Sequence, residues 1–436
     1  MTQLNTVELL SDRLAGCRKG CAAFIAGLFM LTAIMTAAPG MTLVPMDMAQ
    51  TDHLKAYGIV HRHLQRGGQV EWLLNYRGGS FLVQNDEQFL KDCRLHGVAM
   101  QFPSPAELAG IRTLIETENM DAVMLERATR LAVYAPPTAD PWDDAVRLAL
   151  DYAGIDYDRV WNEEVLAGKL SEYDWLHLHH EDFTGQYGKF YRSYRHAEWY
   201  QQMVAIYEAM ARRLGFSKVS RMKLAVVQTI REYISEGGML FAMCSATETF
   251  DVAWAARNTD ICAAVFDGDP VDPDYADKLC YEGCLAFENF NVVTDPMIYS
   301  HSDIDTYFEA IERGPDVYIT LFDFSAKFDQ VPTMLVQNHV GLVPEFLGQN
   351  VGFRRERLKP DVLVMGEVRN TEQVKYIHGR FGEGTFTFLG GHDPEDYAHR
   401  VGDPPTDLSL HKNSPGYRLI LNNVLFPAAE EKKLRT

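Results

Sequence analysis

Short apolar runs alternate with amphipathic stretches from about residue 131 onward. The amphipathic stretches cover 142–152, 192–236 and 247–256, and their apolar side chains recur at the spacing of a helix. Runs of apolar residues bounded by Gly, Pro or polar clusters predict strands, here at 131–134, 157–161, 175–179, 239–243, 317–321, 333–337, 362–365 and 385–389. The alternation predicts a mostly parallel sheet covered by helices on both faces, with ligands at the carboxyl ends of the strands.

The region before this series has a pattern of its own. A short apolar strand at 42–46 precedes a helical stretch within 47–66 and a strand at 70–76, which glycine pairs bound on each side. This order predicts a right-handed strand–helix–strand unit. We therefore expect an N-terminal α/β segment over 39–130 and a main domain over 131–436, with a helical insertion near 183–236.

The first 38 residues resemble an export signal. Arg13, Arg18 and Lys19 precede the apolar run 21–38, which small residues close. The run is also close to the length of about 20 residues that an uncleaved membrane anchor needs. Both alternatives predict an exported protein, periplasmic or secreted, that contacts the membrane only through this segment if it is not cleaved.

Composition narrows the class of partner. The chain has 47% hydrophobic and 23% charged residues, as folded globular proteins do. Its formal charge of −19 argues against a nucleic-acid partner, because binding phosphates requires a basic surface. We expect a small-molecule or carbohydrate ligand instead.

A cysteine with small neighbours lies between a predicted strand and a predicted helix, in Ala242-Met243-Cys244-Ser245-Ala246. Small residues two positions before and two after are the spacing of a nucleophile elbow. The start of a helix favours the thiolate, and its amide groups can stabilise an oxyanion. We predict Cys244 as a nucleophile and Ser245 as a substrate contact. The alternative is that Cys244 is only a small buried residue at a strand end.

The predicted base for this cysteine is His392, which follows the candidate strand 385–389. A cysteine nucleophile needs a base and a carboxylate that orients the base, and Glu395 supplies the carboxylate. A histidine in a glycine-rich loop can equally be structural.

Two further polar clusters follow strands. The stretch 173–186 (YDWLHLHHEDFTGQ) places His179, His180 and Glu181 at the carboxyl end of a strand. Imidazole and carboxylate groups at this density can bind zinc, but their spacing matches no zinc motif. We therefore expect them to bind substrate rather than a metal. Arg77 begins Arg-Gly-Gly-Ser at another strand end and is a candidate anion contact, although a plain turn explains the glycines equally well.

The segments GGMLFAMCSATETF and GEGTFTFLGGHDPEDY, with SPGYRLILNNVLFPA after them, are similar to the ThuA-like branch of the class I glutamine-amidotransferase-like superfamily. The resemblance covers roughly 131–428 and implies a three-layer α/β domain of class I glutamine-amidotransferase-like or flavodoxin-like type. Members of this branch commonly carry histidine where this chain has Cys244, whereas the amidotransferases carry cysteine. The amidotransferase motif is H-P-E, and this chain has one extra residue between His392 and Glu395.

The opening stretches PMDMAQTDHLKAYG and EWLLNYRGGSF also resemble bacterial proteins labelled asparagine synthetase B. That reaction requires an N-terminal cysteine and an S-G-G-x-D-S pyrophosphate loop, and this chain has Thr2 and no such loop. The leading hypothesis is a hydrolase-type enzyme that attacks an amide or a sugar-derived substrate. The alternative is a non-catalytic protein of the same fold that binds a carbohydrate or cell-envelope ligand.

Overall fold

The computed structural model describes residues 40–137 and 143–430. The predicted signal or anchor segment and Trp142, where the helix 142–152 was expected to begin, lie outside the described residues. Within the described part, no helix is both long and apolar enough to cross a membrane.

The N-terminal region forms a four-stranded sheet of β1 (Met41–Val44), β2 (Val70–Leu74), β3 (Ser80–Gln84) and β4 (Asp121–Leu125). The order is β1-β3-β2-β4, and each neighbouring pair is antiparallel. The expected strand–helix–strand order is present, with α1 (His53–Gln65) between β1 and β2. These two strands run in the same direction, but β3 lies between them. Helices α2 (Glu87–His96) and α3 (Pro105–Thr117) connect β3 to β4.

The second sheet has ten strands in the order β10-β9-β12-β13-β14-β8-β7-β5-β6, with β11 beside β13. Five neighbouring strands are parallel to one another: β14 (Gly384–Leu389), β8 (Met239–Met243), β7 (Trp175–Leu178), β5 (Leu131–Tyr134) and β6 (Asp158–Val160). The others pair antiparallel: β9 (Tyr318–Leu321), β10 (Leu342–Pro344), β11 (Phe353–Arg354), β12 (Leu363–Val368) and β13 (Gln373–Phe381). The α/β class is confirmed, with a mixed sheet whose parallel part carries the predicted strand ends.

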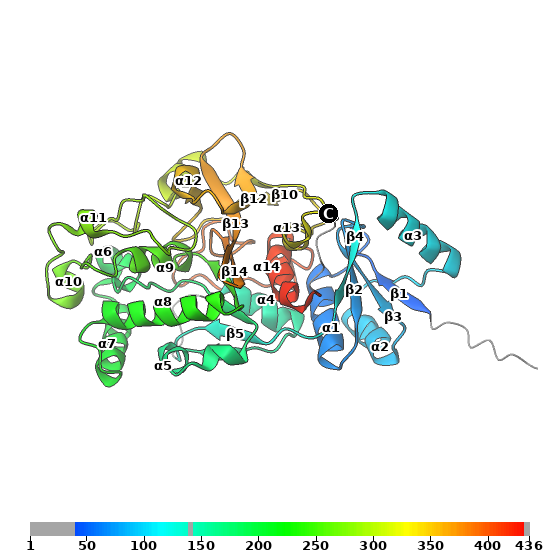
Figure 1. Cartoon of the computed structure of the whole chain (residues 1–436), viewed down its shortest axis with the longest axis horizontal. Coiled ribbons are helices and arrows are strands. Elements are labelled where there is room, and N and C mark those ends of the chain that lie inside the picture. The colour runs from blue at the N-terminus through cyan, green and yellow to red at the C-terminus, as the bar shows by residue number, and fades with distance from the viewer. Residues whose placement is uncertain (1–39, 138–142, 431–436) are drawn as a thin grey trace, which may run out of the picture. The chain divides into compact units, whose positions relative to one another are not determined.

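Helices cover both faces of the parallel strands (Figure 1). Successive residues of β8 alternate between two cores, so that Phe241 packs in one and Leu240 and Ala242 pack in the other. The first core includes residues of α1, α4 (Ala145–Ala153) and α14 (Pro415–Leu425). The second core includes α5 (Asn162–Leu166), α7 (Glu198–Arg213), α8 (Val219–Ser235) and α9 (Ala246–Ala255). The parallel strands are therefore buried between helices.

One predicted strand is wrong. Residues 333–337 were expected to be extended, but the chain forms α13 (Gln330–Leu335) there, and α13 packs against α14. The remaining helices are short: α6 (Tyr191–Tyr194), α10 (Ala264–Asp267), α11 (Tyr275–Lys278), α12 (Tyr307–Arg313), and the 3-10 turns Lys169–Glu172, Tyr187–Lys189, Arg355–Arg357 and Phe426–Ala428.

Candidate functional site

Three adjacent parallel strands, β7, β8 and β14, end at the same edge of the sheet, which we call the rim. In register, Leu178 lies opposite Ala242 and Leu389 lies opposite Met243. Beyond the strands, the Ala246 N–H donates to the His179 carbonyl at 3.0 Å, and the Cys244 N–H donates to the Gly391 carbonyl at 3.1 Å. These bonds bring the cysteine turn and the two histidine-bearing loops together.

Cys244 forms a strained elbow between β8 and α9. Its φ is 51°, in the left-handed region that residues with a side chain rarely adopt. The Thr247 hydroxyl donates to the Cys244 carbonyl at 2.6 Å. Ala242, Ser245 and Ala246 are fully buried, so larger side chains in their place would disturb the turn. The backbone has the conformation that the small-residue spacing predicts.

The thiol of Cys244 lies in an enclosed environment. The residue is only 2% exposed, and its Sγ accepts the Gln349 N–H at 3.3 Å. Burial raises the pKa of the thiol to about 11, although the backbone N–H groups of Gln349, Ser245 and Asn350 partly oppose the rise. The thiol is therefore protonated at neutral pH, because desolvation outweighs the stabilisation expected from the helix start.

His392 lies at the same rim, but its ring faces other histidines. It is 4.6 Å from the His179 ring, 6.0 Å from the His180 ring and stacked at 4.7 Å on the His399 ring, centre to centre. Among the described residues, neither ring nitrogen of His392 has a hydrogen-bond partner. Cys244 and His392 thus share the rim without a hydrogen bond between thiol and imidazole.

The remaining predicted site residues are placed apart. Glu395 contacts His411, with Oε2 2.8 Å from Nδ1, and lines a surface cavity of about 380 Å³. Arg77 lies in the turn between β2 and β3, where its Nε is 2.6 Å from an Asp47 carboxylate oxygen. Ser245 is buried below the elbow, and no described residue forms a hydrogen bond with its hydroxyl.

The acidic residues after His180 turn away from the histidines. Glu181 pairs with Lys223 at 3.0 Å and accepts the Tyr207 hydroxyl at 3.1 Å. Asp182 accepts the Gly188 N–H at 2.9 Å and lies 3.5 Å from His301. The strand end therefore delivers imidazoles to the rim, while its carboxylates support the loops around it.

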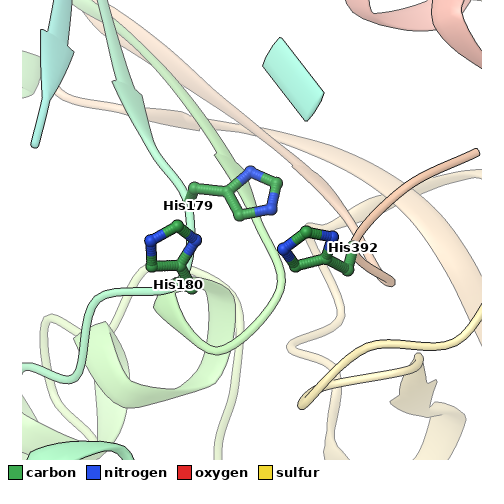
Figure 2. A group of neighbouring side chains, drawn as sticks. All are labelled: His179, His180 and His392. Atoms are coloured by element: carbon green, nitrogen blue, oxygen red, sulfur yellow. The ribbon is translucent and has the colours of Figure 1, made fainter. Parts of the chain in front are cut away.

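Figure 2 shows His179, His180 and His392 around a common centre. One ring nitrogen from each of them lies within 4.8 Å of the others. Burial, together with the neighbouring histidines, holds the pKa of His179 and of His392 well below the usual value. Both imidazoles are therefore neutral, with lone pairs available to accept a proton or a metal ion. We call these three residues the histidine cluster.

Sequence reasoning missed the aspartates that support this cluster. Asp144 Oδ1 lies 3.5 Å from His179 Nδ1 and 3.4 Å from His177 Nε2. Asp143 Oδ1 lies 2.7 Å from His399 Nε2. The sequence signal that could have found them is the Asp143-Asp144 pair, which follows β5 and lies directly before α4. Since β5 is the neighbour of β7 in the sheet, residues after β5 are expected near the residues after β7.

No family model matches the chain, and no curated protein matches it. Solved structures that it resembles include two Salmonella typhimurium proteins described as cytoplasmic. The first has 13% sequence identity and a TM-score of 0.35, and the match covers 70% of this chain and 100% of that chain. The second has 14% sequence identity and a TM-score of 0.34, and the match covers 69% of this chain and 99% of that chain. A beta-galactosidase from Bacillus circulans has 11% identity and a TM-score of 0.24 over 60% of this chain and 28% of that chain. Similarity at this level carries no argument about function.

Proposed function

We propose that the protein is a hydrolase-type enzyme whose reaction centre is the rim formed by β7, β8 and β14. The observation that carries the proposal is the left-handed Cys244 at the end of β8, between two strands whose ends hold neutral imidazoles. Strained conformations of residues other than glycine concentrate at functional sites. The carboxyl ends of parallel strands are also where α/β proteins bind ligands.

The geometry favours the imidazoles over the thiol as the groups that move protons. A thiol must lose its proton before it attacks, and burial of Cys244 opposes that loss. His392 can instead take a proton from an attacking water molecule, with His179 beside it. In this mechanism Cys244 shapes the elbow and does not attack the substrate. The role of Cys244 as nucleophile stays a prediction.

The proposed substrate class and family come from the sequence resemblance. The cysteine elbow after β8, the Gly-Gly-His-Asp-Pro-Glu loop after β14 and the terminal helix α14 support membership of the ThuA-like branch and a three-layer flavodoxin-like core. In this proposal, α7 and α8 belong to a helical insertion, and the substrate is an amide or a sugar derivative. Export is proposed from the leader sequence, and N-terminal sequencing of the mature protein from its host tests it.

The hydrolase proposal is tested with the purified protein and a panel of chromogenic amino-acid anilides and aryl glycosides. We expect turnover of at least one class of probe, reduced about 100-fold or more by His392→Asn. His378→Asn, which alters another buried histidine on β13, is the matched control and retains the rate. Absence of turnover across the panel, or equal turnover by the His392→Asn variant, refutes the proposal.

A second candidate function is non-catalytic binding of a carbohydrate or cell-envelope ligand. The surface cavity of about 380 Å³ favours it, because polar side chains including Thr51, His411, Lys412 and Asn413 line it. Its volume is in the range of small-ligand sites. Thermal-shift measurements with a panel of oligosaccharides test this function, and a stabilisation that Lys412→Ala removes, together with no hydrolysis, supports it over the enzyme.

A further inference from the structure

We propose that His179, His180 and His392 form a binding site for a divalent transition-metal ion of the zinc type. The three side chains come from the loops after β7 and β14, which flank β8 (Figure 2). One nitrogen from each ring lies within 4.8 Å of the others. This inference goes beyond the proposed hydrolase and is separate from it: a neutral imidazole has one lone pair, so His392 serves as a base only while it binds no ion.

The spacing of the nitrogens is close to what zinc requires. Zinc–nitrogen bonds of about 2.0–2.1 Å in a tetrahedral site place the ligand nitrogens about 3.4 Å apart. Side-chain movement of the three rings would have to bring the nitrogens from their present spacing, within 4.8 Å of one another, to that value. Imidazole-only ligands suit zinc and its neighbours in the periodic table, whereas calcium and magnesium require oxygen ligands.

The surroundings of the rings point independently to an occupant. His179 and His392 are 2% and 6% exposed, and among the described residues no hydrogen bond reaches a ring nitrogen of either. A buried polar atom left without a hydrogen-bond partner destabilises the fold. A bound ion would use one lone pair from each ring and remove part of that destabilisation.

Carboxylates are placed to orient the ligands. Asp144 Oδ1 lies 3.5 Å from His179 Nδ1, so a small movement would let it accept an N–H from that nitrogen and leave Nε2 for the metal. His399, stacked on His392, is held by Asp143 at 2.7 Å and by Asp396 at 2.9 Å. This stacking fixes the plane of the His392 ring. Asp144 and His399 are therefore positioning residues for the site.

A second group of possible ligands overlaps the first but fits less well. Asp144, His177 and His179 also lie within 4.8 Å of one another. However, His177 Nδ1 is 3.1 Å from the Phe241 carbonyl, and the ring is fully buried between β7 and β8. An ion there would leave His392 unused, so the variants at His392 distinguish the two sites.

The test uses the full chain with its affinity tag removed, stripped with a chelator and titrated with Co²⁺ and Zn²⁺. We expect one tightly bound ion per chain by calorimetry, and a visible cobalt spectrum of tetrahedral or five-coordinate type. His392→Ala and His179→Ala should weaken binding about 100-fold or more, and Asp144→Asn about 10- to 100-fold. His378→Ala, at a buried histidine outside the cluster, should bind as the unmodified protein does.

Circular dichroism of each variant identifies any that fails to fold, and His392→Gln then replaces His392→Ala as the less disruptive change. The proposal is overturned if the unmodified protein takes up no ion, or if the folded His392 variant binds as tightly as the control. Metal uptake without hydrolysis would refute the hydrolase alone. Hydrolysis that is seen only in the metal-free protein would support His392 as the base, and calorimetry decides metal binding separately.

Discussion

The backbone of Cys244 has the conformation of a nucleophile elbow, but the surroundings of its side chain keep the thiol protonated and neutral. Its φ of 51° satisfies the sequence prediction, while the raised pKa of about 11 opposes the predicted chemistry. Small residues around a turn can be read from the sequence, since they permit close backbone approach. The Gln349 N–H that covers Sγ comes from a segment 105 positions away, which no local pattern indicates.

Alkylation should therefore occur at Cys280 before Cys244. Cys280 is partly exposed and Cys244 is buried, and both are free thiols. A short pulse of iodoacetamide at neutral pH, followed by peptide mass mapping, measures the order. Labelling in denaturant, where both thiols should react alike, is the control. Faster labelling of Cys244 than of Cys280 in the folded protein would support the predicted nucleophile instead.

The buried His301 should make stability depend on pH. Asp182 and Glu248 lie 3.5 Å from its ring nitrogens, and despite burial they raise the pKa of His301 to about 9. Because the folded-state pKa exceeds the usual 6.5, the stabilisation is complete below about pH 6.5 and is lost as the pH rises through about 9. The loss amounts to about 3 kcal/mol.

Urea unfolding at about pH 6 and about pH 9.5 measures this contribution. His301→Gln should be less stable than the unmodified protein at the lower pH and should lose less stability between the two. An equal loss in both proteins would show that other groups cause the pH dependence.

At the scale of elements, the turn after β14 positions His392 through a glycine. Gly391 has φ of +99°, and a Cβ there would lie 2.4 Å from the Phe346 ring. Its carbonyl also accepts the Cys244 N–H, so the turn connects the elbow to the histidine cluster. We expect Gly391→Ala to destabilise the fold by about 2–4 kcal/mol, as strain and the clash add.

Gly402→Ala is the matched control for this change. Gly402 has a similar φ of +93°, but a Cβ added there would have no atom within 4 Å beyond its chain neighbours. It should therefore report the backbone strain alone, about 1–2 kcal/mol. Denaturant unfolding of both variants measures the difference. Equal destabilisation would show that Phe346 moves aside without cost.

All five parallel strands of the second sheet were predicted, whereas in its antiparallel part β9 and β12 were predicted and β10, β11 and β13 were not. Strands such as β5 and β8 are uninterrupted apolar runs, as strands buried on both faces must be. β13 has the sequence QVKYIHGRF, in which Lys375 and His378 interrupt the apolar pattern that predicts a buried strand. The strand is nevertheless almost wholly buried. The wrong strand at 333–337 follows Pro332, which is tolerated in the first turn of α13.

The rim was predictable for a related reason. Adjacent parallel strands end at one edge, so Cys244, His179 and His392 were expected there, and the register places their loops together. Side-chain directions beyond a strand end follow no periodicity. The pairing of His392 with His179, and of Glu395 with His411, therefore emerged only from the packed structure.

At the scale of the whole chain, one buried cation connects the main body to the N-terminal region. Arg418 of α14 is fully buried, and its guanidinium donates to the Met46 carbonyl at 2.9 Å and to the Gly78 carbonyl at 2.7 Å. Both carbonyls belong to loops beside the first sheet. The arginine also lies over the Tyr57 ring of α1, 5.9 Å from its centre. The side chain thus joins three segments that are far apart in sequence.

Arg418→Met should preserve much of the side-chain volume but remove the donor of the Gly78 carbonyl and one neighbour of the Met46 carbonyl, which also lies 3.0 Å from His53 Nε2. One or two buried acceptors left unpaired, at about 1–3 kcal/mol each, predict a loss of about 1–6 kcal/mol in the free energy of unfolding. Arg94→Met, at an exposed position on α2, should change it by less than about 0.5 kcal/mol. Urea unfolding followed by tryptophan fluorescence gives both values.

If Arg418 matters mainly for joining the two regions, its variant should also unfold with a shallower denaturant slope, because the N-terminal sheet would separate before the main body. A single transition of unchanged slope and midpoint would show that α14 holds the two regions together through apolar contacts alone.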